Sequence, residues 1–316
     1  MKPSLLVIMD PIAGIKVHKD STFAMLLEAQ ARGWPIAYAE QHWLSQRHGR
    51  SLARARPLQV QDDPQHWFDL GGMEQRPIDD FDLVLMRKDP PLDLDYIATT
   101  WLLDQPAAGG TLVVNHPAAL RNANEKLAAT RFPQFCPPVL VSCDAAELSA
   151  FVDAEGDVIL KPLDGMGGAS VFRVRPHDPN RNVIVETLTR HGRRLIMAQR
   201  FIPEIAAGDK RILVIDGEPV PWALARIPAQ GETRGNLAAG GRGEGVALSE
   251  RDREIVAGVA PWLRENGILF AGLDVIGDYL TEINITSPTC IRELDTLYSL
   301  NIAGTLLDRI EDILAA

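Results

Sequence analysis

The order of apolar and polar positions predicts an α/β region at the start of the chain. The apolar run from Leu5 to Met9 suits a buried strand, and the stretch from Asp20 to Gly33 has helical periodicity, an N-cap candidate and a C-terminal glycine. Two further short apolar runs, at 83–86 and 111–115, predict more strands. Residues 1–122 are therefore expected to form an α/β domain.

Beyond this region the pattern changes to strand pairs around helices. Strands are predicted at 158–161, 170–174, 195–201, 211–215 and 220–227, and a hairpin at 268–276 and 279–286. A helix is predicted from Ser249 to Glu265, because Ser-x-x-Asp resembles a capping box and Asn266-Gly267 suits a C-cap. A helical region ends the chain. These elements indicate an α+β arrangement with antiparallel sheets.

Composition narrows the function to small-molecule chemistry. The 316 residues suffice for two or three subdomains around one cleft, and the net charge of −10 without a dense Lys/Arg run argues against nucleic acid or anionic membrane as a partner. No segment has the length of a membrane span, and three cysteines without CxxC spacing suggest neither a disulfide framework nor a zinc site. The expected location is the cytoplasm.

Two absences limit the chemistry further. The loop after the first strand lacks GxGxxG, so a dinucleotide-binding oxidoreductase is disfavoured. The seven histidines show no HExxH or comparable cluster, so any metal is expected to be bound by oxygen atoms.

A glycine-rich turn follows the strand at 158–161. Its glycines, Gly165, Gly167 and Gly168, would let backbone N–H groups approach an anion closely. The turn lacks GK[ST] and is followed by a strand, so it is not a Walker P-loop. An ordinary hairpin turn remains the alternative explanation.

The C-terminal hairpin carries a candidate metal site. Glu282 and Asn284 point to one face of a strand, and Asp274 lies on the partner strand. Two carboxylates and an amide oxygen are ligands that Mg²⁺ prefers. A two-residue turn at Gly277-Asp278 would pair Asp274 with Thr281, so bringing the carboxylates together requires a longer loop or a bulge. The alternative is a polar solvent face.

Several segments in fixed order resemble the ATP-grasp superfamily. They are Asn124-Glu125-Lys126, Ile159 to Pro162, the glycine turn, Gly272 to Asp274, and Glu282 to Asn284. Within that superfamily, the segments 85–91, 232–241 and 285–293 are similar to those of the bacterial glutathione synthetases. The resemblance covers essentially the whole chain. It implies an α/β N-terminal domain (1–122) followed by an α+β ATP-grasp fold, with a small lobe (123–200), a large lobe (201–316), and ATP held between two antiparallel sheets.

The resemblance also implies a nucleotide and metal site. Lys126 and Lys161 would neutralise the ATP phosphates, and the glycine turn would cover them. Gln199, Phe201 and Ile202 match the linker between the lobes, where adenine would bind. Asp274, Glu282 and Asn284 match the Mg²⁺ ligands of the family, with Mn²⁺ as a possible replacement.

The activity implied is ligation of γ-glutamylcysteine to glycine through an acyl phosphate. Arg226, and more weakly Arg211, would stabilise the charge that develops during transfer. The residues expected to hold substrate are Arg87, Arg234, Asn236, Ser287 and Arg292. By resemblance, a homotetramer is also expected.

A glycine-rich segment at 229–245 is predicted to be a lid that closes over bound substrates, with a passive surface loop as the alternative. Another ATP-grasp carboxylate-amine ligase, such as one joining two D-alanines, would share all nucleotide and metal residues. A nucleotide-binding module without catalysis is the alternative of a different class.

Overall fold

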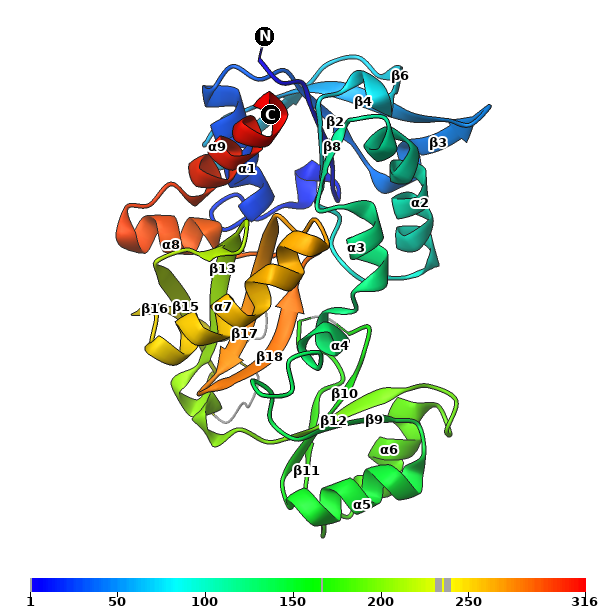
Figure 1. The fold of residues 1–316 in the computed structure, drawn as a ribbon, viewed down its shortest axis with the longest axis vertical. Helices are drawn as coiled ribbons and strands as arrows, with labels where there is room; N and C mark the ends of the chain where they lie inside the picture. The colour runs from blue at the N-terminus through cyan, green and yellow to red at the C-terminus, as the bar shows by residue number, and fades with distance from the viewer. Residues whose placement is uncertain (1, 166, 231–234, 236–239) are drawn as a thin grey trace.

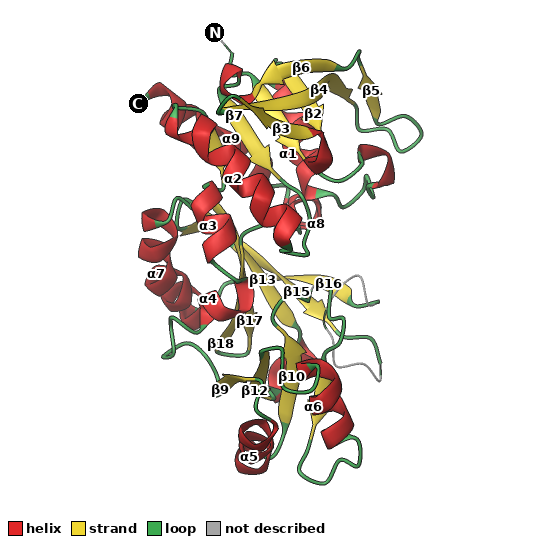
Figure 2. Ribbon diagram, turned by 90° about the vertical axis from the view of Figure 1, so that its right-hand side faces the viewer, coloured by secondary structure: helices red, strands yellow, loops and turns green. Residues whose placement is uncertain are grey.

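The molecule is built on three sheets that follow one another along its long axis (Figure 1). The computed structural model describes residues 2–165, 167–230, 235 and 240–316. The first sheet lies at the end that carries both termini, the third sheet lies in the middle, and the second sheet forms the opposite end (Figures 1 and 2). The chain therefore passes from the first sheet to the far end and returns.

The first sheet has a parallel centre, in which β1 pairs with β2 and β7, and β7 pairs with β8. Its order is β3-β4-β2-β1-β7-β8, with β5 and β6 also paired to β4. The strands are β1 (Leu5–Ile8), β2 (Ile36–Ala39), β3 (Leu44–Arg47), β4 (Arg50–Val60), β5 (Phe68–Leu70), β6 (Glu74–Pro77), β7 (Leu83–Met86) and β8 (Leu112–Val114). The predicted strands and helix of this region are confirmed, whereas the antiparallel part from β3 to β6 was not predicted.

Helices cover both faces of this sheet. They are α1 (Ser21–Ala31), α2 (Leu94–Ala108) and α3 (Pro117–Asn122), with short 3₁₀ turns η1 (Ile12–Gly14), η2 (Gln41–Trp43) and η3 (Ile78–Asp80). The Asp20 carboxylate caps α1 by accepting a hydrogen bond from Phe23 N–H at 2.7 Å, as the sequence predicts.

The second sheet is antiparallel, in the order β11-β10-β12-β9. The chain reaches it through α4 (Glu125–Ala129), and the sheet consists of β9 (Val139–Ser142), β10 (Val158–Pro162), β11 (Phe172–Val174) and β12 (Ile196–Arg200). Apolar residues of α5 (Ala145–Glu155) and α6 (Arg181–Thr189) pack against β10 and β12 in a separate core. The other face of this sheet is thus left for the cavity described below.

The third sheet is also antiparallel, in the order β16-β15-β13-β17-β18, with β14 paired to β13. The 3₁₀ turn η4 (Pro203–Ala207) leads into this sheet. Its strands are β13 (Asp209–Ile215), β14 (Glu218–Pro219), β15 (Trp222–Ile227), β16 (Arg242–Ala247), β17 (Phe270–Ile276) and β18 (Tyr279–Asn284). Between β16 and β17 lies α7 (Glu250–Glu265), whose capping box joins Ser249 and Asp252 reciprocally as predicted.

The register of the β17–β18 hairpin includes the expected bulge. Ile276 pairs with Tyr279 across a two-residue turn, and the pairing shifts between Asp274 and Val275. As a result Asp274 lies opposite Glu282 and not opposite Thr281. The bulge brings the two carboxylates together, which confirms that part of the metal-site hypothesis.

The last helices return to the first sheet. After α8 (Ile291–Tyr298), helix α9 (Ile302–Ala315) packs against α1, and Arg32 joins them by donating to the Gly304 carbonyl at 2.9 Å. The C-terminal end of the predicted large lobe (201–316) therefore lies beside the N-terminal domain. The predicted division of the chain into residues 1–122, 123–200 and 201–316 otherwise remains a prediction.

The Asn115 side chain joins the first sheet to the third. Its amide donates to the carbonyls of Phe270 and Ile285, each at 2.7 Å, and its Oδ1 accepts from Phe270 N–H at 2.9 Å. Asn115 is buried. The side chain thus supplies three of the buried contacts between the two sheets.

We expect Asn115→Ala to lower the free energy of unfolding by about 2–4 kcal/mol, because buried backbone groups of Phe270 and Ile285 lose their partner. Chemical denaturation followed by circular dichroism measures this value. The exposed Asn122, changed to alanine in parallel, should shift the value by no more than about 0.5 kcal/mol. Equal shifts for both variants would contradict the assignment.

Within the part of the chain that the structure describes, no helix is both long and apolar enough to cross a membrane.

Candidate active site

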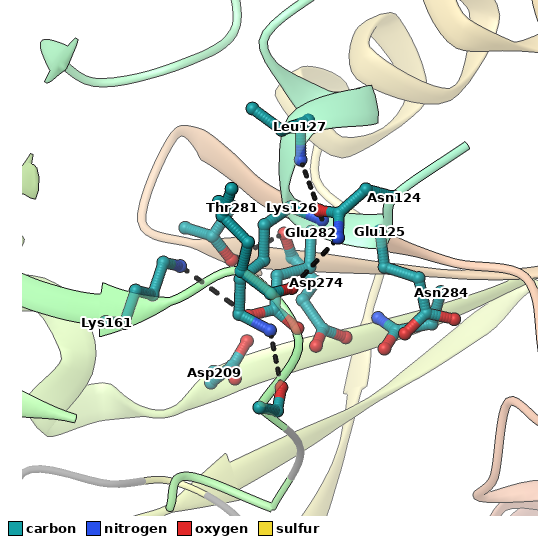
Figure 3. Close-up of polar contacts among 12 residues, drawn as sticks. Asn124, Glu125, Lys126, Leu127, Lys161, Asp209, Asp274, Thr281, Glu282 and Asn284 are labelled. Carbon is teal, nitrogen blue, oxygen red and sulfur yellow. Dashed lines mark hydrogen bonds and ion pairs between the residues drawn. The ribbon is translucent and has the colours of Figure 1, made fainter. Parts of the chain in front are cut away.

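One large cavity, of about 720 Å³, is lined by residues of the second and third sheets and by loops and a helix end next to the first sheet. The second and third sheets contribute the strands β10, β12, β13, β15, β17 and β18, and the first-sheet region contributes the loops after β1 and β7. The candidate residues from these separate segments converge on this space (Figure 3).

Two buried lysines face a carboxylate at one end of the cavity. Lys126 Nζ lies 3.6 Å and Lys161 Nζ 3.5 Å from Glu282 Oε1. Burial lowers the pKa of Lys161, and Glu282 partly opposes that effect. Burial alone would raise the pKa of Glu282, but the two lysines outweigh it and hold the pKa below its ordinary value. The arrangement is a pair of cations that share one carboxylate as their ion-pair partner.

The short helix α4 positions Lys126. The side-chain oxygen Oδ1 of Asn124 caps α4 by accepting from Lys126 N–H and Leu127 N–H, each at 3.1 Å (Figure 3). The Asn124 amide donates to the Leu163 carbonyl at 3.0 Å, and Lys126 Nζ donates to the Gly165 carbonyl at 2.7 Å. The helix is therefore tied to the glycine turn on the second sheet.

A second charged cluster lies around Asp274. Arg211 donates to both of its carboxylate oxygens, at 2.5 and 3.1 Å, and an Arg226 amino nitrogen lies 2.9 Å from Asp274 Oδ2. Burial alone would raise the pKa of Asp274, but the two guanidinium groups outweigh it and lower the pKa. Asp274 is therefore a buried anion held by two arginines.

Asp209 is a member of this cluster that the sequence analysis missed. Its Oδ2 lies 2.5 Å from an Arg226 amino nitrogen, and its Oδ1 is buried without a hydrogen-bond partner among the described residues. Burial raises the pKa of Asp209. The residue starts β13 beside Arg226 of β15, so only the strand pairing reveals its place.

The predicted metal ligands have a suitable arrangement of oxygen atoms. Asn284 lies opposite Gly272 and donates its amide to the Gly272 carbonyl at 3.1 Å, which leaves its Oδ1 as an acceptor. With Asp274 and Glu282 paired by the bulge, two carboxylates and one amide oxygen line the same cavity. The described residues, this set included, contain no group of three or more His, Cys, Asp or Glu side chains that could hold a metal, so the Asn284 amide oxygen is needed as the third ligand. The donor set fits a hard divalent cation.

The predicted nucleotide residues also line the cavity. Gly167 and Gly168 have φ values of +64° and +78°, a conformation that favours glycine. Gly165, Gln199, Phe201 and Ile202 join them as lining residues. The Arg173 guanidinium lies 3.6 Å from the centre of the Phe201 ring and is itself paired with Asp157.

The predicted substrate residues have different outcomes. Arg87 and Ser287 line the cavity, and Arg87 is held by hydrogen bonds to Thr22 and the Pro288 carbonyl. Arg292 is not among the lining residues of the described chain: its guanidinium pairs with Asp62 at 2.8 Å. A role for Arg292 in holding substrate therefore stays a prediction. Arg234 and Asn236 lie outside the described residues.

The end of the segment predicted to be a lid is a strand, and the closing movement itself stays a prediction. Residues 242–245 of the segment 229–245 belong to β16, which pairs with β15, and Arg242 forms an exposed ion pair with Glu244. Gly243 and Gly245 approach Leu224 and Tyr298 closely, so these glycines serve packing. Of the other predicted loop residues, 231–234 and 236–239 lie outside the described chain.

Two family models together match nearly the whole chain. The description of the first is prokaryotic glutathione synthetase, N-terminal domain, at residues 4–121, and that of the second is prokaryotic glutathione synthetase, ATP-grasp domain, at residues 125–299. The chain is 58% identical over 316 residues to a glutathione synthetase of Pseudomonas syringae pv. tomato, covering 100% of this chain and 99% of the relative. It is 59% identical to one of Xanthomonas campestris pv. campestris, covering 98% of each.

The chain belongs to the prokaryotic glutathione synthetase family. It has the ATP-grasp fold and is an ATP-dependent ligase, as the sequence analysis predicts. Among solved structures, D-cycloserine synthetase DcsG matches with a TM-score of 0.68 at 14% identity, over 98% of this chain and 100% of that chain. This likeness supports the fold alone.

This member of the glutathione synthetase family has a second group of cavity residues that the sequence analysis missed. Lys16, Lys19, Asp20 and Glu293 line the part of the cavity next to the first sheet, with Arg87 between the loops. Burial raises the pKa of Asp20 and of Glu293, and Glu293 Oε2 has no partner among the described residues. These residues come from loops and from α8, whose proximity no sequence periodicity indicates.

Gly235 is a described residue of the glycine-rich segment that touches the charged cluster. A Cβ atom at this position would lie 2.4 Å from the Arg226 carbonyl oxygen and 3.1 Å from Asp209 Cβ. We expect Gly235→Ala to lower kcat/KM by about tenfold to a hundredfold, because the backbone carrying Arg226 must shift. Steady-state kinetics measures the effect. Gly72→Ala is the control, because a Cβ atom at position 72 would meet nothing within 4 Å; similar losses in both variants would contradict the argument.

Proposed function

We propose that the chain joins γ-glutamylcysteine to glycine in an ATP-dependent reaction that proceeds through an acyl phosphate. The observation that carries the proposal is the set of four cations, Lys126, Lys161, Arg211 and Arg226, around the Asp274–Glu282 pair in one cavity. Carboxylate activation by phosphoryl transfer needs positioned positive charge more than a covalent nucleophile.

ATP is proposed to lie between the second and third sheets. Its phosphates would meet Lys126 and Lys161 under the glycine turn, where both lysines form ion pairs with Glu282. Its base would lie near Gln199, Phe201 and Ile202, at the connection between the two sheets. The phosphate end then points toward the arginine cluster.

Asp274, Glu282 and Asn284 would hold the divalent cation, proposed to be Mg²⁺ with Mn²⁺ as a replacement. When bound, such a cation neutralises phosphate charge and orients the transferred group. Each proposed ligand presents an oxygen atom, and the bulge in β17–β18 accounts for the pairing of the two carboxylates.

Arg226 and Arg211 are proposed to stabilise the negative charge that develops on the transferred phosphoryl group and on the adduct. In the first step the substrate carboxylate oxygen attacks the γ-phosphorus, giving the acyl phosphate and ADP. In the second step the neutral amine of glycine attacks the carbonyl carbon, and phosphate leaves as the amide forms. Arg226 is nearly inaccessible to solvent, so its charge acts in a medium of low polarity.

The dipeptide is proposed to occupy the half of the cavity next to the first sheet. γ-Glutamylcysteine carries an amino group and two carboxylates, and this half presents both signs of charge. Lys16, Lys19 and Arg87 could pair with a carboxylate, while Asp20 and Glu293 could accept from the amino group. The cysteinyl carboxylate would then point toward Arg226 and the phosphates.

The decisive experiment is phosphate release from ATP with γ-glutamylcysteine and glycine, compared with D-alanine pairs, with glutamate, and with no acceptor. Stoichiometric release of phosphate and appearance of glutathione are expected only with the first pair. Ligation of D-alanine or glutamate would favour another carboxylate-amine ligase. ATP binding without any product would favour the non-catalytic alternative.

Two further expectations belong to the proposal. A homotetramer is supported by the family resemblance, and sedimentation of the purified protein tests it. A cytoplasmic location is supported by the three cysteines, which are all free in the structure.

A further inference from the structure

Glu125 holds the end of β18 through a single oxygen atom. Its Oε1 accepts hydrogen bonds from Ile285 N–H at 2.9 Å, Thr286 N–H at 3.1 Å and the Thr286 hydroxyl at 2.9 Å. Both Ile285 and Thr286 are buried. The carboxylate therefore satisfies two buried backbone donors that follow β18 directly.

The two segments that Glu125 joins carry proposed site residues next to the contact. Glu125 immediately precedes Lys126, and Ile285 immediately follows Asn284. The same helix turn is tied to the glycine turn through Asn124 and Lys126. Glu125 thus connects the helix with the proposed phosphate-binding lysine to the strand with two proposed metal ligands.

The environment of Glu125 agrees with a fixed position. Burial raises its pKa, while the hydrogen bonds from Thr286 and Ile285 oppose that effect. Glu125 also lines the cavity, so a displacement would be transmitted to the site at once.

We propose that Glu125 is a positioning residue, which fixes the distance between Lys126 on α4 and the carboxylate and amide ligands on β18. The inference rests on the proposed function, because that distance matters only if the lysine and the metal bind the same phosphates. Without the carboxylate, the Ile285 and Thr286 N–H groups lose their partner and the strand end moves relative to α4.

The test compares Glu125→Ala with Glu125→Gln and Thr286→Val. We expect Glu125→Ala to lower kcat at saturating ATP and Mg²⁺ by about 10–100-fold. Glu125→Gln keeps an acceptor oxygen and should retain kcat within about fivefold of the unaltered protein. Thr286→Val removes only the hydroxyl donor and should cost about two- to tenfold in kcat.

A binding readout separates positioning from loss of the fold. The dissociation constant of ADP is measured in the presence of a chelator and in the presence of Mg²⁺. The first value divided by the second, called the ADP ratio, reports how well the metal ligands meet the nucleotide. In Glu125→Ala the ratio should fall by about tenfold or more, while the chelator value changes little.

Asp82→Ala is the matched control. Asp82 Oδ2 accepts from Ser4 N–H and the Ser4 hydroxyl, both at 2.7 Å, so the control loses the same kinds of bond far from the cavity. It should lower the melting temperature and leave kcat and the ADP ratio unchanged.

Equal kcat and an equal ADP ratio in Glu125→Ala and the unaltered protein would overturn the proposal, as would an equal loss in Asp82→Ala. If Glu125→Ala does not fold, an unchanged kcat in Thr286→Val overturns it. Absence of ligation by the unaltered protein would instead refute the proposed function, with the ADP ratio still testing the position of Glu125.

Discussion

Alanine at position 226 is expected to lower kcat for ligation by about a hundredfold or more, with a much smaller change in nucleotide affinity. The Arg226 guanidinium lies within 3 Å of both Asp209 and Asp274 at the border of the cavity. Its proposed partner is charge that develops only during transfer, so the ground-state complex with ATP should form almost normally.

This variant needs a control for stability. Removing the guanidinium takes a cationic partner away from the buried carboxylates of Asp209 and Asp274. Such a loss lowers the free energy of unfolding by about 3–5 kcal/mol in comparable buried pairs. The double variant Asp209→Asn with Arg226→Ala removes one of these charges and should recover thermal stability without recovering kcat. Rapid-quench kinetics at saturating ATP and calorimetric nucleotide binding measure the two effects. Weak ATP binding with normal turnover at saturation would show that Arg226 acts in binding.

Glu282→Gln is expected to lower ligation by at least about a hundredfold at ordinary metal concentrations. The substitution keeps the shape of the side chain and removes the charge that lies opposite Asp274. It also removes the carboxylate from between Lys126 and Lys161. In the presence of a chelator, the variant should therefore bind ATP at least as tightly as the unaltered protein does. Its turnover should require a higher Mg²⁺ concentration.

Titration of activity with Mg²⁺, together with metal-free ATP binding by fluorescence, checks both parts. Asp278→Asn is the control, because it neutralises an exposed carboxylate on the turn of the same hairpin. If Glu282→Gln ligates normally at every metal concentration, Glu282 is not a metal ligand.

The sequence predicts the site best where chemistry and strand geometry coincide. Alternation along β18 indicates that Glu282 and Asn284 share a face, and the need for a bulge opposite Asp274 follows from counting residues across the turn. Likewise, the capping pattern predicts the start of α7. In each case the signal lies within a few residues of the feature.

The unpredicted features depend on contacts between distant segments. The buried positions of β4 include Ser51, Ala53 and Ala55, small residues that give a weak hydrophobic signal although burial alternates along the strand. Asp209 reaches Arg226 only because β13 pairs with β15. Arg292 of α8 pairs with Asp62, which is 230 residues away in the sequence, and no local pattern indicates that contact.

The return of the chain to its first sheet has a consequence during synthesis. Leu5, Val7 and Leu83 belong to a core that is completed by Leu306 and Ile310 of α9. The ribosome makes α9 on the order of 10–40 seconds after β8, at about 5–20 residues per second. In that interval the nascent chain exposes apolar surface on a sheet that is already made. Chaperones that bind apolar segments therefore have a defined target and a defined end point, the release of α9 from the exit tunnel.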